Sequence, residues 1–523
     1  MAAALTAWTV HLVFVVVLGF TVFVSQRRVP ALFCGAASPD ESSSSSKASA
    51  PAPVPGGGDQ FRRFQRLYLV CVLICLAGDW LQGPYMYALY DAYGFEHDEI
   101  AALFVAGFGS SCVFGTFVGS LADTIGRKRG ALLYVLTYVL SCATKHWNSY
   151  AVLMVGRVLG GVSTSLLFSV FDSWVVSEHA RRGFDPALLS TLFANVQAGN
   201  SAVAIAAGVV GEWAARLWPM RTARGGRHLP LEKNDGSIVF GGFCTPFDVA
   251  AVVLLVGGAA VSWTWTENYG AAGQGGGVQG TGSVVLASLK AGTATVFRDK
   301  KVLLVGLISA LFEAAMYSFV FEWTPAVKAS PTDRPPYGEI FSIMMLACAA
   351  GTRVYAARLA PAAGSASNAN VTLVFAAASV ALFVPSTIES PFLCLVAFLV
   401  FEVSVGIYFP AIAVLKSKLI PDAHRSTIYN LFRVPLNVLV LAVLLSRAPG
   451  KVIFAASACL VALAAIAHFD LHRRLAQRDD YKGQDLEADS FSDQGDASSS
   501  AKEGTQRLLD DDSNATTAYD HHQ

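Results

Sequence analysis

The polar stretch Gly119-Ser-Leu-Ala-Asp123-Thr-Ile-Gly126-Arg127-Lys128-Arg129-Gly130 separates two apolar segments and decides how the chain folds. Its glycines permit a tight turn and a close approach of two helices. The aspartate can cap or pair near a helix end, and three consecutive cations favour the cytosolic face of a membrane. The stretch therefore predicts a cytosolic turn between two membrane-spanning helices. It acts either as an ordinary basic loop or as a gating loop through Gly119, Asp123, Gly126 and Arg127.

The composition is that of a protein that crosses a membrane many times. The chain has 523 residues, of which 54% are hydrophobic and 15% are charged, and its mean hydropathy is +0.48. Soluble domains contain fewer apolar and more charged residues. Because the formal net charge is zero, nothing indicates a nucleic-acid partner. The expected partner of this surface is the lipid bilayer.

The nine cysteines lie mostly in apolar stretches, without a C-x-x-C spacing. Cys71 and Cys75 stand one helical turn apart, which permits either a soft-metal pair or two small buried helix residues, and the second interpretation is favoured. We therefore expect reduced thiols, no metal site and no cofactor.

Apolar segments of about 20 residues, long enough to cross a bilayer, follow one another along most of the chain. They predict an all-α polytopic fold with a twelve-helix core in two six-helix halves, plus one extra helix at the N-terminus. The predicted core spans are 67–90, 99–121, 130–146, 150–176, 188–210, 247–266, 302–323, 340–358, 372–384, 392–415, 427–445 and 452–471.

The first apolar run, residues 6–24, precedes Arg27 and Arg28 and has two interpretations. A cleaved signal peptide is one, but the run is long and lacks a basic segment before it, so an extra helix with an external N-terminus is favoured. The predicted organisation is an extra transmembrane helix 1–28, a flexible linker 29–60, an N-terminal half 61–266, a cytosolic loop 267–300, a C-terminal half 301–472 and a disordered cytosolic tail 473–523.

The distribution of Lys and Arg orients the chain in the membrane. Loops on the same side as Arg127 carry Arg181, Arg182, Lys300 and Lys301, as the positive-inside rule requires. The loop 213–243 disagrees, since it is basic and yet falls on the external side. Long loops influence orientation less than short ones, so the assignment of the cytosolic side stands.

Ionisable and amide side chains inside spans are functional candidates, because each costs several kcal/mol there unless it meets a partner or water. In the first core span, Asp79 and Gln82 fall on one helical face, and Tyr85 offers a hydroxyl. Gly83-Pro84 interrupts this span. Such a break is typical of substrate-binding broken helices, but it also occurs as a kink for packing.

Two arginines in later spans are the main candidates for holding an anion. Arg157 lies four residues before Gly161. It either binds the solute or takes part in proton coupling, or it forms a structural ion pair with an acidic group such as Asp79. Arg433 shares a helical face with Asn437 beside a proline, which suits an oxyanion. The alternative for Arg433 is an arginine that extends to the cytosolic boundary.

The deep carboxylates are candidates for proton coupling or charge balance: Asp79, Glu313 and Glu402. Glu402 and Lys416 are fourteen residues apart, about 21 Å along a helix, so they cannot pair directly.

Several motifs together resemble known families. The Gly119 to Gly130 stretch is similar to the signature loop of the major facilitator superfamily, and Arg157 to Gly161 resembles its R-x-x-x-G motif. The core resembles the molybdate-anion transporters, the major facilitator superfamily domain-containing protein 5 group. The motifs of this resemblance are DWLQGPY (79–85), ALYDAY (88–93), GRVLGGVSTSLLF (156–168), FEWTP (321–325), GIYFP (406–410) and NLFRVPLN (430–437).

The resemblance implies uptake of molybdate, a tetrahedral dianion, across the plasma membrane by alternating access. A site for it needs cations with hydroxyl or amide donors, and the candidates are Arg157, Arg433, Gln82, Asn437 and Tyr85. Two other classes stay open: a carrier of another anion or an organic solute, and a non-transporting membrane sensor. An enzyme is disfavoured because the chain lacks a P-loop, an H-E-x-x-H motif and a nucleophile elbow. The sequence names no protein partner.

Overall fold

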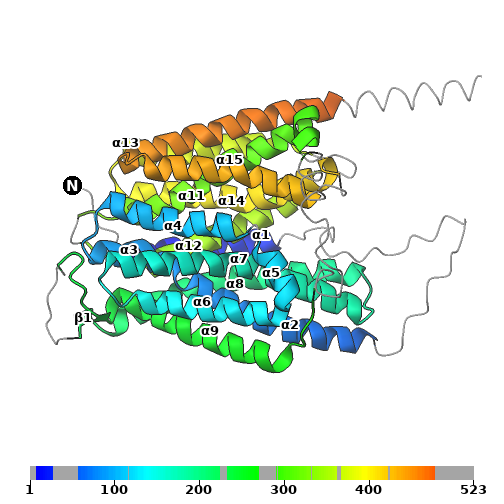
Figure 1. Cartoon of the computed structure of the whole chain (residues 1–523). Helices are drawn as coiled ribbons and strands as arrows, with labels where there is room; N and C mark the ends of the chain where they lie inside the picture. The colour runs from blue at the N-terminus through cyan, green and yellow to red at the C-terminus, as the bar shows by residue number, and fades with distance from the viewer. Residues whose placement is uncertain are drawn as a thin grey trace, which may run out of the picture.

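The computed structural model describes residues 7–26, 57–115, 117–223, 232–269, 290, 293–330, 333–361, 367–421 and 425–477. Its helices lie alongside one another in a bundle (Figure 1). The predicted linker and C-terminal tail lie outside the described residues, apart from a few at their edges. Within the described part, ten helices are long and apolar enough to cross a membrane.

The helices overlap the predicted spans, except that the predicted span 99–121 is divided between two helices, His97–Gly115 and Val118–Ile125. The all-α membrane fold is confirmed. The extra helix is α1 (Ala7–Gln26). The N-terminal half contains α2 (Gly57–Trp80), η2 (Gly83–Tyr85), α3 (Met86–Ala92), α4 (His97–Gly115), α5 (Val118–Ile125), α6 (Arg127–Thr144), α7 (Tyr150–Arg181), α8 (Ala187–Leu217) and α9 (Thr245–Thr264). The C-terminal half contains α11 (Lys300–Ala326), α12 (Tyr337–Val354), the π-helical turn η5 (Tyr355–Leu359), α13 (Asn370–Thr387), α14 (Pro391–Leu419), α15 (Arg425–Leu445) and the helix Gly450–Gln477.

The first core span is broken where the sequence predicts it. The helix α2 ends at Trp80, and a short 3-10 turn that contains Pro84 leads into α3. Proline has no N–H for the helical ladder and restricts the preceding residue. The break changes the helical register, so the side chains before and after it do not follow the single face of a straight helix.

The signature stretch is mostly helical rather than an open loop. Gly119 and Asp123 lie in α5, and α6 begins at Arg127. The turn is concentrated in Gly126, whose φ of 106° lies in the region that favours glycine. Gly130 allows α5 and α6 to approach closely, because a Cβ there would lie 3.1 Å from the Ala122 side chain. The predicted tight turn is therefore confirmed at one residue only.

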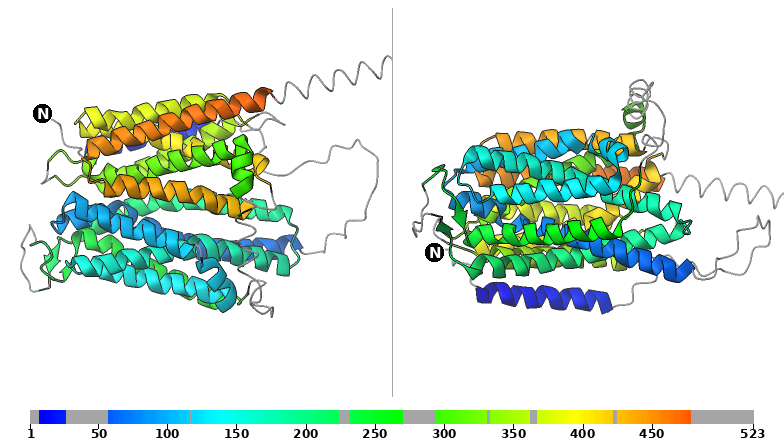
Figure 2. Two further views of the ribbon diagram at one scale, coloured as in Figure 1. Left: turned by 45° about the horizontal axis from the view of Figure 1, so that its top comes forward. Right: turned by 60° about the horizontal axis from the view of Figure 1, so that its bottom comes forward.

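The two halves form two groups of helices, and α1 lies at the edge of the bundle (Figure 2). The helix α1 packs on α12, where His11 lies 3.5 Å from Glu339. The halves meet through α8 with α12 and through α4 with α15. The α8 and α12 backbones touch, because a Cβ on Gly338 would lie 2.3 Å from the Gly208 carbonyl oxygen. Glycines at this crossing thus bring the halves together.

A small antiparallel hairpin covers one end of the N-terminal half. It pairs β1 (Arg221–Thr222) with β2 (Val239–Phe240), and it lies within the basic external loop that disagrees with the charge rule. The backbone of Asn148, between α6 and α7, bonds to Ser237 and Gly236 in this loop. The loop is therefore folded onto the N-terminal half beside the end of α6.

Candidate functional site

Ion pairs join the two halves at one end of the bundle. This end lies opposite the Arg127 turn, and from the charge distribution it is called the external end, whereas the end with the turn is called the cytosolic end. Lys328 Nζ lies 2.6 Å from Asp91 Oδ2, and His97 Nε2 lies 3.2 Å from Glu322 Oε1. The external end is therefore closed.

Aromatic rings form a second cross-half contact below these ion pairs. The ring of Phe321 on α11 lies 5.2 Å from the ring of Phe104 on α4 and 5.5 Å from that of Tyr87 on α3. Phe108 meets Tyr317 at 5.2 Å. Such ring contacts exclude water, so they separate the centre of the bundle from the external side.

Tyr85, a predicted substrate ligand, has its hydroxyl engaged in this structure. It donates to Glu212 Oε2 at 2.9 Å, and the same oxygen accepts from the backbone N–H of Gly338 on α12 at 2.9 Å. Arg216 Nε binds the other oxygen at 2.7 Å. The Glu212 carboxylate thus holds the broken first span against the C-terminal half. Tyr85 takes part in the contact between the halves here.

The Arg157 guanidinium lies in the N-terminal half between α7 and α4. Its Nε donates to the Leu103 carbonyl oxygen at 3.1 Å, and its Cζ lies 4.9 Å from the centroid of the Phe104 ring. No carboxylate of the described residues is within ion-pairing distance of it. Because Phe104 also touches Phe321, Arg157 stands directly beside the cross-half aromatic contact. A cation without a counter-ion in this setting favours an anionic ligand.

Asp79, one acidic group considered as a partner of Arg157, is engaged elsewhere. Its Oδ1 accepts a hydrogen bond from the Tyr138 hydroxyl. Gln82 is buried, and its Nε2 donates to the Gly78 carbonyl oxygen at 3.0 Å. The side-chain oxygen of Gln82 has no hydrogen-bond partner in the described part of the chain. Asp79 and Gln82 therefore lie near the break in the first span, but with separate partners.

Lys145 is a buried cation that the sequence analysis missed. It follows the last residue of α6 and is 0% exposed. Its Nζ lies 5.7 Å from the centroid of the Tyr90 ring, and both this Nζ and the Tyr90 hydroxyl lack a hydrogen-bond partner among the described residues. Burial, reinforced by the Arg157 charge, lowers the pKa of the Lys145 amine to about 7.

The C-terminal half holds a basic cluster of a different kind. The Glu313 carboxylate on α11 accepts from the Tyr408 hydroxyl at 2.7 Å and lies 3.8 Å from Lys416 Nζ. The positive charge of Arg433 on α15 lies close enough to Lys416 and Tyr317 to interact electrostatically with both. The side chain of Arg433 is exposed, with no hydrogen bond or ion pair to another described residue. Sequence spacing did not reveal the Glu313–Lys416 pair, because it joins two different helices.

The two other predicted residues of the C-terminal half occupy contrasting places. Asn437 Nδ2 lies 3.0 Å from Cys112 Sγ on α4, so it contacts the N-terminal half. Glu402 on α14 is 5% exposed, and its carboxylate makes no hydrogen bond or ion pair within the described residues. A solitary buried carboxylate in a span favours the protonated form.

At the cytosolic end, the signature turn is braced by the segment after α9. Glu267 Oε1 accepts from the Lys128 N–H at 2.7 Å, and Asn268 accepts from the Arg127 N–H at 2.9 Å. A carboxylate at the start of α6 complements its helix dipole. The Arg127 side chain binds Asp123 at 2.7 Å and the Ser173 carbonyl oxygen at 3.1 Å.

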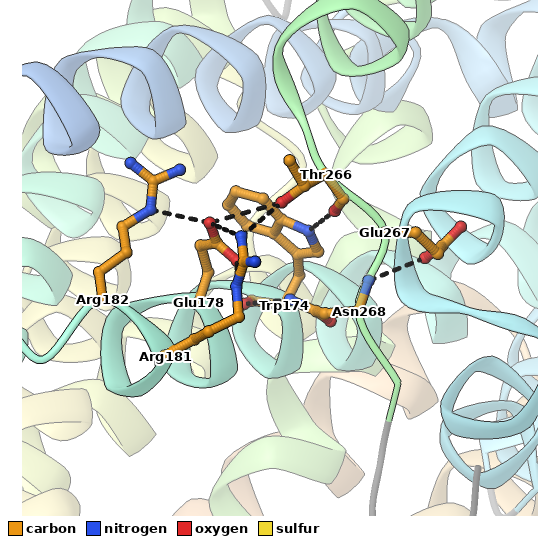
Figure 3. Close-up of polar contacts among 7 residues, drawn as sticks. All are labelled: Trp174, Glu178, Arg181, Arg182, Thr266, Glu267 and Asn268. Atoms are coloured by element: carbon orange, nitrogen blue, oxygen red, sulfur yellow. Dashed lines mark hydrogen bonds and ion pairs between the residues drawn. The ribbon is translucent and has the colours of Figure 1, made fainter. Parts of the chain in front are cut away.

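The same segment is tied to α7 (Figure 3). Trp174 Nε1 donates to the Thr266 carbonyl oxygen at 2.8 Å, and Glu178, which is fully buried, binds Arg181 and Arg182. The helices joined in this way belong to the N-terminal half, and the bracing segment directly follows its last helix α9. In this structure the predicted gating residues therefore stabilise the N-terminal half as one unit.

The described residues contain no group of three His, Cys, Asp or Glu side chains that could hold a metal ion. Cys71 and Cys75 are both buried. Cys71 Sγ lies 3.4 Å from the Thr264 hydroxyl.

Two helical halves that close against each other at one end, with unpaired cations between their helices, define a polytopic membrane transporter of the major facilitator superfamily type. Solved structures show the same fold. A peptide transporter matches with a TM-score of 0.58 and 15% identity, over 78% of this chain and 95% of that one. A D-xylose-proton symporter matches with a TM-score of 0.56 and 12% identity, over 77% of this chain and 97% of that one.

Relatives in sequence narrow this class. A family model described as sugar transporters with 12 TM matches residues 42–221 and 236–404. A molybdate-anion transporter of Xenopus tropicalis is 36% identical over 392 residues, 73% of this chain and 78% of that protein. One of Danio rerio is 33% identical over 405 residues, 72% of this chain and 78% of that protein. The chain belongs to the molybdate-anion transporter family, and it is an integral multi-pass membrane protein.

Proposed function

We propose that the protein takes up molybdate into the cell by alternating access, in the plasma membrane. The observation that carries this proposal is the Arg157 guanidinium, which lies between helices without a carboxylate partner among the described residues. A charged group in a span costs roughly 2.5 to 3.5 kcal/mol on insertion scales. An oxyanion ligand offsets that cost. The names of the relatives support molybdate as this ligand.

The two arginines suit a tetrahedral dianion. Each guanidinium offers parallel N–H donors to two oxygens at once. Arg157 belongs to the N-terminal half and Arg433 to the C-terminal half. An anion bound by both arginines therefore draws the two halves together. Gln82 and Asn437 add amide donors. We assign Tyr85 to the site only in states in which its bond to Glu212 has opened.

A dianion entering a cell works against the membrane potential. Two negative charges moved against 100 mV cost about 4.6 kcal/mol. Co-transported protons reduce this cost, and the deep carboxylates Asp79, Glu313 and Glu402 are the groups that can carry them. Glu402 is the best placed, since it is buried without a partner in the described part of the chain.

The alternating movement is a rocking of one half against the other. Opening the external end requires separation of Asp91 from Lys328 and of His97 from Glu322. The turn at Arg127 is braced by Glu267 and Asn268, which directly follow the last helix of the N-terminal half, and by no described residue of the C-terminal half. The turn therefore lets this half move as a rigid body during the exchange.

Two other functions have less support. A sugar carrier agrees with the description of the family model, but a neutral sugar leaves Arg157 without a counter-charge. A non-transporting sensor gives the central cations no role. We propose that the protein is a transporter rather than an enzyme.

The test is metal content measured by mass spectrometry in molybdate-starved cells with and without the protein. We expect molybdenum to accumulate only with the protein, and excess tungstate or sulfate to reduce it while sugars leave it unchanged. Truncation after residue 477 should leave uptake intact, which excludes a sensor that works through the tail. Equal molybdenum in both cell lines would overturn the proposal.

A further inference from the structure

The group that the transport site leaves unexplained is Lys145. Its amine is fully buried at the external end of the N-terminal half, and its Nζ has no hydrogen-bond partner among the described residues. The neighbouring Tyr90 hydroxyl is buried and unpartnered as well within the described part of the chain. The amine lies 5.7 Å from the centroid of the Tyr90 ring. Two buried donors without partners in one such region are rare in folded proteins, because each group forfeits its hydrogen bonds to water.

The backbone around Lys145 is built to keep the amine in this place. The Tyr93 hydroxyl and, at 3.8 Å, Cys244 Sγ bond to the Lys145 carbonyl oxygen. The loop with the β1–β2 hairpin holds the next residue, His146, because the Val239 N–H donates to the His146 carbonyl oxygen at 2.7 Å. Gly156 leaves room for the amine, because a Cβ there would lie 3.1 Å from Lys145 Nζ. The position of the amine is therefore specified from several sides.

Charge around the amine calls for an anion. Arg157 on α7 is close enough to disfavour the charged form of Lys145. The nearest acidic group on α9, Asp248, is engaged by His146 Nε2 at 2.7 Å. From α3 the titratable neighbours are Tyr90 and Tyr93, and from α6 Cys142. None of these described neighbours is a carboxylate that is free to neutralise the amine.

We propose that Lys145 Nζ, the Tyr90 hydroxyl and the Arg157 guanidinium form an oxyanion subsite at the external side of the transport path. This inference rests on the proposed function and adds to it the residues that receive a tetrahedral dianion before it reaches the centre. The lysine and the hydroxyl each donate to one oxygen, and Arg157 is shared with the central site. The external ion pairs and the aromatic contact close over the subsite in the present state.

The subsite links binding to protons. Since the pKa of the Lys145 amine is about 7 without a ligand, the amine is largely neutral above that pH. A dianion stabilises the ammonium form, so binding raises this pKa and takes up one proton. The dissociation constant should therefore be insensitive to pH well below 7 and rise above it, by at most tenfold per pH unit for one proton. One proton per anion also reduces the charge that crosses the membrane.

The test is molybdate binding to the purified full-length protein by titration calorimetry at pH 6, 7 and 8.5. For wild type we expect the dissociation constant to rise above pH 7. Lys145→Met should raise it about tenfold or more at pH 6, because a charge-assisted bond is lost, and should abolish the pH dependence. Lys145→Arg should bind with little pH dependence, since arginine stays protonated in this range.

Tyr90→Phe keeps the test valid if the lysine variants fold poorly. It removes only a hydroxyl that has no partner in the described structure, so thermal stability without ligand should be unchanged or higher. Its dissociation constant should rise about tenfold. The matched control is Lys233→Met, which removes an exposed external lysine paired with Glu99 and should bind as wild type.

Two outcomes separate this inference from the proposed function. If wild type binds molybdate, but its affinity is independent of pH and Tyr90→Phe and Lys145→Met bind equally well, the subsite is wrong and the transport proposal stands. If folded wild type binds neither molybdate nor tungstate, both are wrong.

Discussion

The two halves of the protein each contain a basic cluster, and the clusters differ in how their charges are compensated. In the C-terminal half, Lys416 lies 3.8 Å from the Glu313 carboxylate. In the N-terminal half, Arg157 and Lys145 have no carboxylate partner among the described residues, and Asp79 is bonded to Tyr138 instead. In the C-terminal cluster one of the two cations is thus compensated by a carboxylate, whereas in the N-terminal cluster neither cation is, within the described residues.

This difference indicates a division of work. Buried cations without counter-ions are costly, and a protein retains them where a ligand neutralises them for part of the cycle. We therefore propose that the N-terminal cluster is the principal anion-binding group. The C-terminal cluster, with the exposed Arg433 and the Glu313 carboxylate, is better suited to exchange the anion and its protons with water.

The largest expected effect distinguishes the two arginines. Arg157→Gln should lower kcat/KM for molybdate uptake about 30-fold or more, because the N-terminal cluster loses a charge-assisted fork. Arg433→Gln should lower it about tenfold, since Lys416 stays nearby. The measurement is initial uptake at matched surface expression. A matched control is Arg474→Gln, which removes an arginine paired with Asp470 at the end of the last helix and should behave as wild type.

The next largest effect comes from making the C-terminal cluster as poorly compensated as the N-terminal one. Glu313→Gln removes the carboxylate that compensates Lys416, so the C-terminal cluster becomes as positive as the N-terminal one. We expect KM for molybdate to fall about threefold to fivefold and release to slow, by the Coulomb attraction of a freed cation at an intermediate dielectric. Tyr408→Phe, which keeps the carboxylate, is the control. An unchanged KM for Glu313→Gln would show that the pair does not shape the anion site.

A smaller effect concerns the contact between the halves. Lys328→Met removes the pair with Asp91 at the external end. A partly exposed ion pair contributes about 0 to 1 kcal/mol, so the conformational equilibrium should shift at most about fivefold towards the externally open state. Hydrogen exchange of residues 86–92, followed by mass spectrometry, should become faster. Lys233→Met, whose pair lies within one half, should leave this exchange unaltered.

The smallest effect is a pH dependence at the external cap of the N-terminal half. Although burial opposes the charged form, the bond to Asp248 raises the pKa of His146. The stabilisation is therefore complete below the ordinary histidine pKa and is lost as the pH rises through the raised value. Because Asp248 is half-exposed, we expect less than about 1 kcal/mol. The melting temperature of wild type should fall slightly from pH 6 to 8, and that of Asp248→Asn should not.

Sequence reasoning succeeded where one local signal decided the structure. Apolar length located the spans, and Pro84 located the break in the first one. Arg157 and Arg433 were identified because any cation in a span needs a reason. In the described structure neither has a carboxylate partner, and this keeps both as anion candidates.

Sequence reasoning failed where tertiary contacts decide the environment of a side chain. Lys145 lies at the external end of the predicted span 130–146, where a lysine is typically expected to extend to the membrane boundary. Its burial depends on helices α3 and α7 and on packing near the hairpin loop. Tyr85 was a candidate ligand because it offers a hydroxyl, but the sequence of the first span does not reveal that this hydroxyl bonds to Glu212 on α8. Pairs such as Glu313 with Lys416 join helices that are distant in sequence.

The central claim is that the unpaired cation of the N-terminal half binds molybdate as the protein carries it across a membrane. The most direct measurement is uptake of radioactive molybdate into liposomes that contain only the purified protein, compared for wild type, Arg157→Gln and empty liposomes. We predict that wild type fills the liposomes and that Arg157→Gln falls to within a few per cent of the empty level. Uptake by Arg157→Gln equal to that of wild type, or wild type no faster than empty liposomes, would contradict the account.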